Sequence, residues 1–94
     1  MKVLLVYDVS TSDPQGPRRL RRVARACQDY GQRVQKSVFE CSVGAVEWVQ
    51  LRTRLLAEFD ATRDSLRFYF LESDVEIEHH GAGEPWDMDG PLVV

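Results

Sequence analysis

One carboxylate and a cluster of arginines are the residues of this 94-residue chain that could do chemistry together. Asp8 follows the apolar residues 3–7, and five arginines lie between Arg18 and Arg25. A carboxylate at the end of a strand can hold a divalent cation, and guanidinium groups stabilise charge on phosphate oxygens. The pattern therefore indicates metal and phosphate chemistry. The alternatives are that Asp8 only caps the next loop and that the arginines form a solvated helix face.

Two elements must place these groups side by side. Residues 3–7 are rich in β-branched side chains and too few for a helix, so they predict a buried central strand with Asp8 at its carboxyl end. Turn formers occupy residues 9–17. A helix is then predicted from about Pro17 to Tyr30, with Gly31 as a left-handed C-cap. The arginines crowd the first turns of this helix, beside the end of the strand.

The rest of the chain predicts two further strands and a second helix. Residues 33–41 partly alternate polar and apolar, as a half-buried strand does, with a bend or bulge near Lys36. Residues 45–60 predict an amphipathic helix, and residues 66–71 an aromatic-rich strand. The expected core positions of the bent strand are Val34, Val38 and Cys41. Those of the second helix are Val46, Val49, Leu55, Leu56 and Phe59, flanked by Trp48 and Leu51 and interrupted by Arg52.

With the bent strand split in two, the element order is βαββαβ. This order predicts an α+β, ferredoxin-like fold, with an antiparallel sheet and both helices on one face. Residues 1–72 would form this unit. Residues 73–94 would be an acidic extension of the same domain, with edge strands at 73–79 and at 92–94.

Charge is divided unevenly along the chain, whose net charge is −3. Residues 1–38 hold eight Lys or Arg and three Asp or Glu, whereas residues 39–94 hold four and twelve, so the halves carry +5 and −8. A basic patch can therefore exist locally. The acidic tail from Glu72 onward would either shield this patch or dock on a basic partner.

Composition also limits compartment and assembly. No apolar run is long enough to span a membrane, and the first strand begins too early for a signal peptide, so we expect a cytoplasmic protein. A core this small favours a homodimer. Cys27 and Cys41 are expected to be core thiols. His79 and His80 point to opposite sides of a strand, which favours solvent exposure over a shared metal.

A family resemblance rests on three segments, which are LLVYDVS, RRLRRVARACQDYGQRVQKSVFEC and DSLRFYFL. Together they resemble the small CRISPR-associated adaptation proteins, the Cas-two family. The resemblance implies a ferredoxin-like homodimer that works with an integrase partner to acquire new spacers and holds duplex DNA. It also implies a magnesium-dependent endonuclease acting on RNA or DNA.

The resemblance carries roles over to particular residues. Asp8 matches the metal-binding acid, and two copies of it across a dimer axis would share Mg²⁺. The expected catalytic residues are Asp8, Arg19 and Arg33. The expected nucleic-acid contacts are Tyr7, Arg18, Arg22, Ser37 and Phe39, although packing is the alternative for the two aromatic rings.

Three functional hypotheses follow from these patterns and from what the resemblance implies. The first is a nuclease with Asp8 as its metal ligand. The second is a non-catalytic scaffold that binds duplex DNA and an integrase. The third, a regulatory domain for a small ligand, has less support because no glycine-rich phosphate-binding loop follows either strand.

Overall fold

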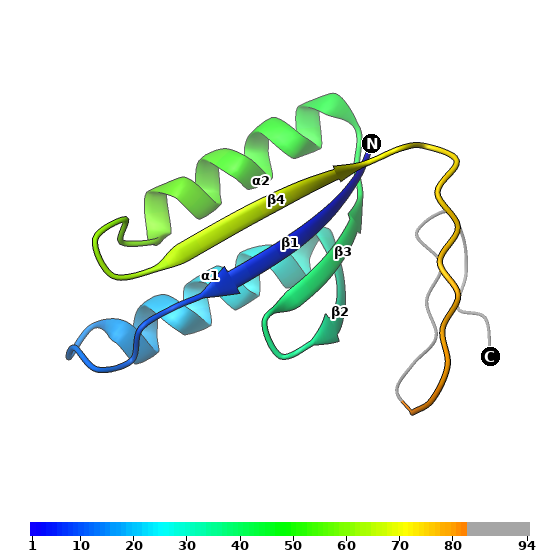
Figure 1. Ribbon diagram of the computed structural model, residues 1–94. Helices are drawn as coiled ribbons and strands as arrows, with labels where there is room; N and C mark the ends of the chain where they lie inside the picture. The colour runs from blue at the N-terminus through cyan, green and yellow to red at the C-terminus, as the bar shows by residue number, and fades with distance from the viewer. Residues whose placement is uncertain (83–94) are drawn as a thin grey trace.

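The computed structural model describes residues 1–82 and has the predicted element order (Figure 1). The elements are β1 (Lys2–Asp8), α1 (Gly16–Tyr30), β2 (Gly31–Gln35), β3 (Val38–Ser42), α2 (Ala45–Glu58) and β4 (Ser65–Leu71). The expected break near Lys36 is confirmed, because residues 36 and 37 form the turn between β2 and β3. A register irregularity also occurs between Arg33 and Gln35.

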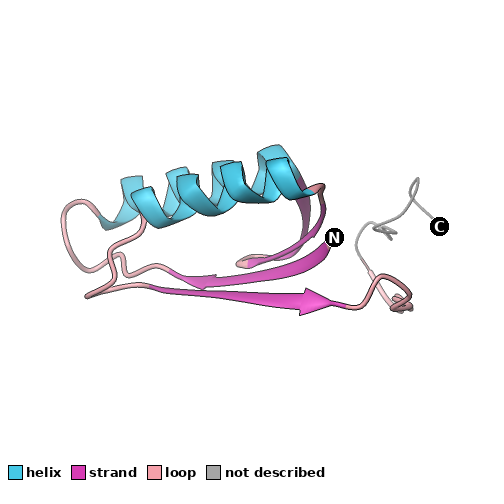
Figure 2. Cartoon of the chain, turned by 90° about the horizontal axis from the view of Figure 1, so that it is seen from above, coloured by secondary structure: helices cyan, strands magenta, loops and turns pink. Residues whose placement is uncertain are grey.

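The four strands form one antiparallel sheet in the order β2-β3-β1-β4, and both helices cover the same face of it (Figure 2). This is the predicted ferredoxin-like α+β arrangement. Strand β1 is central and pairs with β3 on one side and β4 on the other. Because side chains alternate along a strand, every second residue of β1 faces the helices and the residues between them face away.

The hydrophobic core lies between the sheet and the helices. From β1 it takes Val3, Leu5 and Tyr7, and α1 contributes Val23, Ala26 and Cys27. Phe39 and Cys41 of β3 and Trp48, Leu51 and Leu55 of α2 complete it. Both cysteines are buried free thiols, as predicted.

Gly31 does not take the predicted left-handed C-cap. Its φ is −154°, so it is extended and begins β2 directly after the helix. A Cβ on Gly31 would lie 2.4 Å from the Sγ of Cys41 and 2.6 Å from the carbonyl oxygen of Glu40. Glycine is therefore needed for the close approach of β2 to β3 and not for a positive φ.

The prediction for the buried face of α2 was partly wrong. Val46, Val49 and Leu56 are 67%, 61% and 38% exposed. Leu55 is buried as predicted, and Trp48 and Leu51, expected only at the flank, also pack into the core. Apolar residues lie on two sides of α2, and only one side can meet the sheet and α1. Val34 is also exposed and Val38 lies outside the core, because Arg33 and Phe39 pair with each other at the positions that face the helices, and Val38 pairs with Val6 on the helix-free side.

The beginning of the acidic extension differs from its prediction. Residues 73–79 form no strand, although the alternation of acidic and aliphatic residues predicted one. The Nζ of Lys2 donates a hydrogen bond to the carbonyl of Val75, at 3.5 Å. The predicted strand at 92–94 lies outside the described residues. Within residues 1–82, no helix has the length and apolar character required to cross a membrane.

Candidate nuclease and nucleic-acid site

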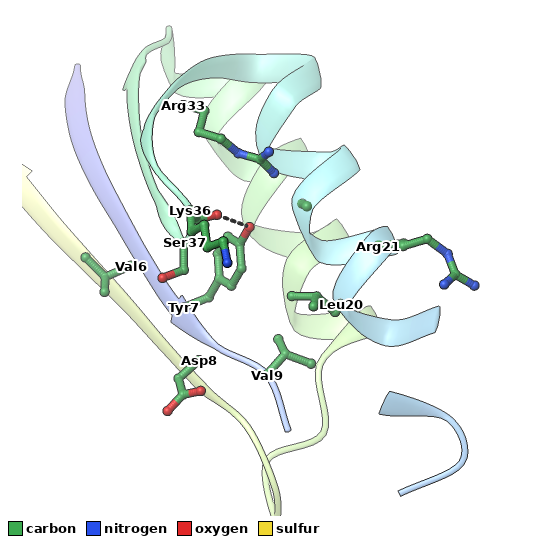
Figure 3. Close-up of a pocket in the computed structure, with 10 residues that line it drawn as sticks. Val6, Tyr7, Asp8, Val9, Leu20, Arg21, Arg33, Lys36 and Ser37 are labelled. Atoms are coloured by element: carbon green, nitrogen blue, oxygen red, sulfur yellow. Dashed lines mark hydrogen bonds between the residues drawn. The ribbon is translucent and has the colours of Figure 1, made fainter. Parts of the chain in front are cut away.

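Asp8 is the exposed last residue of the central strand, opposite Ser65 of β4. Tyr7 faces the helices, so alternation turns Asp8 to the other face of the sheet, and Figure 3 shows its carboxylate pointing away from α1. Among the described residues, this carboxylate makes no hydrogen bond or ion pair. Asp8 is therefore free to accept a ligand from solvent or from another chain.

The helix-free face of the sheet, on which Asp8 lies, mixes apolar and charged side chains. Its residues alternate with the core positions and include Leu4, Val6, Asp8, Val38, Glu40, Arg67 and Tyr69. Tyr69 is 44% exposed. The Oε2 atom of Glu40 is buried without a hydrogen-bond partner in the described part of the chain, and burial raises the pKa of this carboxyl group. This face thus combines uncovered apolar groups with an unsatisfied polar atom.

Tyr7 and Phe39 are packing residues of the core. Phe39 is fully buried, and the Tyr7 ring, 4% exposed, stacks on it with a centroid separation of 6.1 Å. The Tyr7 hydroxyl donates to the carbonyl of Lys36 at 3.1 Å, and burial raises its pKa. The full burial of Phe39 does not suit its expected direct contact with nucleic acid. The tyrosine instead ties β1 to the turn between β2 and β3.

Arg33 is exposed on β2, and its guanidinium covers the core beneath it. The Cζ atom lies 5.1 Å from the centroid of the Phe39 ring, which is within the range of a cation–π contact. Arg33 forms no ion pair with a carboxylate of the described residues. Its charge is therefore available to an anion.

A cleft of about 700 Å³ opens between α1 and the β2–β3 hairpin (Figure 3). Val9, Leu20 and Ala24 supply apolar groups to it, and Arg33, Lys36 and Ser37 supply polar groups from the hairpin. The remaining lining residues are Val6, Tyr7, Asp8 and Arg21. Ser37 is thus placed beside the cations, whereas Lys36 and Arg21 were not predicted as site residues. A lysine at the expected strand break was the signal that could have identified Lys36.

Arg19 does not lie free on the helix surface. Its Nε donates to Oδ2 of Asp64 at 2.6 Å, and its Nη2 donates to Oδ1 of Asp13 at 3.1 Å. The side chain of Arg19 is 10% exposed and that of Asp64 is 0% exposed. Hydrogen bonds from this guanidinium lower the pKa of both acceptor carboxyl groups, Asp13 and Asp64. The geometry therefore makes Arg19 a positioning residue, and it does not support the expected catalytic role.

The other arginines of α1 differ in the charges that surround them. Arg22 pairs with Glu58 at 3.6 Å and Arg25 with Asp29 at 3.4 Å. Arg18 is exposed and has no acidic partner among residues 1–82, and it lines a smaller hollow of about 230 Å³ together with Arg22. Arg18 is thus free to bind a phosphate. Arg22 can also bind a phosphate if its weak surface ion pair with Glu58 breaks.

A metal site built from this chain alone would rest on one acid. In the described region, no group of three or more His, Cys, Asp or Glu side chains is close enough to hold an ion. Mg²⁺ keeps several waters and commonly takes one or two protein carboxylates together with substrate phosphate oxygens. An exposed, unpaired Asp8 fits that donor set when a second carboxylate and a phosphate complete it.

Comparison with known proteins agrees on family and fold. Residues 1–76 match the family described as CRISPR associated protein Cas2. A relative from Chlorobaculum tepidum, named CRISPR-associated endoribonuclease Cas2, is 57% identical over 96 residues that cover 100% of both chains. A relative from Halalkalibacterium halodurans, named CRISPR-associated endonuclease Cas2, is 47% identical over 99% of both chains. A crystal structure of Streptococcus pyogenes Cas2 has a TM-score of 0.71 at 51% identity, covering 84% of this chain and 100% of that one.

Proposed function

The chain belongs to the Cas2 family, and on that premise we propose that it is a Mg²⁺-dependent endonuclease that acts as a homodimer on RNA or DNA. The observation that carries the proposal is the position of Asp8. It is an exposed carboxylate without a partner in the described residues, at the end of the central strand and on the helix-free face of the sheet. The names of the relatives, endoribonuclease and endonuclease, support the same reaction class.

The helix-free face supports the homodimer. Leu4 and Val6 lie there beside Tyr69, and a second copy of this face would remove their apolar groups from water. A donor from that copy would also satisfy the buried oxygen of Glu40. A twofold axis through this face would bring two Asp8 carboxylates toward one another, which supplies the second acid that one chain lacks.

Different residues of the chain would have different roles in phosphodiester hydrolysis. Bound Mg²⁺ would supply Lewis-acid polarisation of a phosphoryl oxygen and activation of water. Asp8 would hold the ion. Arg33 lies on the helix side of the sheet, opposite the Asp8 carboxylate, so it would hold a neighbouring phosphate of the bound strand, as would Arg18 and Arg22. Arg19 would act through the loop that follows Asp8, which it fixes by its bond to Asp13.

The test is the near-isosteric variant Asp8→Asn, compared with Asp74→Asn as a matched change of an exposed acid in the extension. We expect Asp8→Asn to lose Mg²⁺-dependent cleavage of a labelled RNA or DNA strand, with unchanged circular dichroism and dimer mass. Asp74→Asn should cleave like the unaltered protein. Full cleavage by Asp8→Asn would overturn the proposal.

A second candidate function is a scaffold without physiological nuclease activity, which binds duplex DNA and an integrase partner during spacer acquisition. The observation that favours it is a set of exposed cations on α1 and the β2–β3 hairpin that have no acidic partner in residues 1–82, namely Arg18, Arg21, Arg33 and Lys36. Under this function, Asp8→Asn would keep duplex binding and assembly with the integrase. Both functions place the protein in the cytoplasm with the nucleic acid.

A further inference from the structure

The cleft between α1 and the β2–β3 hairpin has a different lining from a surface that only binds a phosphate backbone. Its wall consists of Val9, which is 8% exposed, together with half-buried Leu20 and Ala24. The Tyr7 ring closes the inner end and is held there by its bond to the Lys36 carbonyl (Figure 3). A phosphate group makes no use of apolar walls, whereas a nucleobase does.

The hairpin side of the cleft carries positive charge that the described residues leave unneutralised. Arg33 and Lys36 are both exposed, and neither forms an ion pair with a described carboxylate. In contrast, Arg19 and Arg22 each face an acid. The cleft thus favours an anion, and Ser37 adds a hydroxyl that can donate a hydrogen bond to it.

Size further narrows the class of ligand. A volume of about 700 Å³ lies within the range of pockets that bind small molecules, roughly 300–1,000 Å³. An apolar wall beside two cations matches a nucleotide, which has a flat base and a charged phosphate. A base inside a duplex is stacked and paired, so only an unpaired nucleotide can enter such a cleft.

We propose that this cleft binds one unpaired nucleotide, with its base against Val9 and Leu20 and its phosphate between Arg33 and Lys36. The inference rests on the proposed action on nucleic acid and deepens it by assigning a position for a single-stranded nucleotide. Asp8 lies at the edge of the cleft with its carboxylate turned to the opposite face of the sheet. Nucleotide binding and metal binding are therefore separable by mutation.

The first experiment measures binding of a fluorescent single-stranded hexanucleotide by anisotropy, with adenosine 5′-monophosphate and inorganic phosphate as competitors. We expect the monophosphate to compete at concentrations at which phosphate does not, because only the nucleotide offers a base. The double variant Arg33→Gln, Lys36→Gln should weaken binding by roughly tenfold or more. Arg52→Gln, an exposed cation on α2 outside the cleft, should have a much smaller effect.

The second experiment separates the apolar wall from the charges. Ala24→Met leaves the charge unchanged and fills part of the cleft, so it should weaken hexanucleotide binding while preserving affinity for a blunt duplex. If this variant does not fold, methyl NMR of the unaltered protein replaces it, and the monophosphate should shift the Val9 and Leu20 signals. Absence of those shifts, or equal competition by phosphate, would overturn the nucleotide site.

The two proposals fail in different ways. Asp8→Asn should keep hexanucleotide binding while it loses cleavage. If cleavage depends on Asp8 but the monophosphate does not bind in the cleft, only the nucleotide site is wrong. If the monophosphate binds but Asp8→Asn cleaves normally, only the metal-dependent nuclease is wrong.

Discussion

The guanidinium of Arg19 and the carboxylate of Asp64 join the start of α1 to the loop before β4, with Nε 2.6 Å from Oδ2. The same carboxylate accepts hydrogen bonds from the backbone N–H groups of Ser10 and Asp60. Asp64 therefore organises three segments around one buried group. Because Ser10 follows Asp8 closely, this group also fixes the loop at the end of β1.

Replacing Asp64 should destabilise the fold. Asp64→Asn keeps the shape but removes the negative charge from a network in which Arg19 is 10% exposed. Hydrogen bonds to charged groups contribute about 2 kcal/mol each to stability, so we expect a loss of about 2 kcal/mol in the free energy of unfolding. Urea denaturation measures it. Asp74→Asn, an exposed acid in the extension, is the control and should have almost no effect.

Stability should fall at acidic pH because of the same group. The hydrogen bond from Arg19 lowers the pKa of Asp64 below its ordinary value of 3.8. This stabilisation is complete above the unfolded pKa and is lost as pH falls through the lower pKa of the folded state. Thermal unfolding between pH 7 and pH 2 should show it. The dependence below pH 4 should be weaker in Asp64→Asn, and an identical dependence in both proteins would contradict this origin.

Gly31→Ala should destabilise the sheet. The added Cβ would lie 2.4 Å from the Sγ of buried Cys41 and 2.6 Å from the Glu40 carbonyl oxygen, so β2 must move away from β3. We expect a loss of about 1–3 kcal/mol, as for other overpacked sites, measured by urea denaturation. Gly44→Ala is the control, because its nearest atoms are Glu47 carboxylate oxygens at 3.1 Å, at the end of a flexible side chain.

The two cysteines should resist alkylation in the folded protein. Burial raises the pKa of Cys27 and of Cys41 to about 12, so almost no thiolate forms at pH 8. Mass spectrometry after treatment with iodoacetamide should find neither thiol modified in the native state and both modified in urea. Rapid native labelling would show that the core opens locally around them.

The proposed dimer predicts a charge-sensitive face. Tyr69→Glu puts an acid among the apolar groups of the helix-free face and should convert the dimer to a monomer, because a charge would be desolvated at the interface. Light scattering after gel filtration measures the mass. Val46→Glu alters an even more exposed apolar residue, but on α2, and should remain dimeric. A Tyr69→Glu protein that stays dimeric would place the interface elsewhere.

The sequence by itself determined the local structure and the family. Period-two and helical patterns predicted the element order, the central strand ending in Asp8 and the buried thiols, since these depend on neighbouring residues and on simple burial. The three segments that carry the resemblance also identified the correct family, which the match over residues 1–76 confirms.

Only the tertiary structure decided which of several similar residues meet a partner. Five arginines of α1 look alike in sequence, yet Arg19 turns inward because Asp64, 45 residues further along, is buried beside it. Similarly, α2 offers apolar residues on two sides, and the position of α1 and the sheet selects Leu51 and leaves Val49 exposed. The requirement for glycine at position 31 also comes from tertiary structure, because it arises from the close approach of β3 to β2. Such choices depend on contacts between distant segments, which local periodicity does not encode.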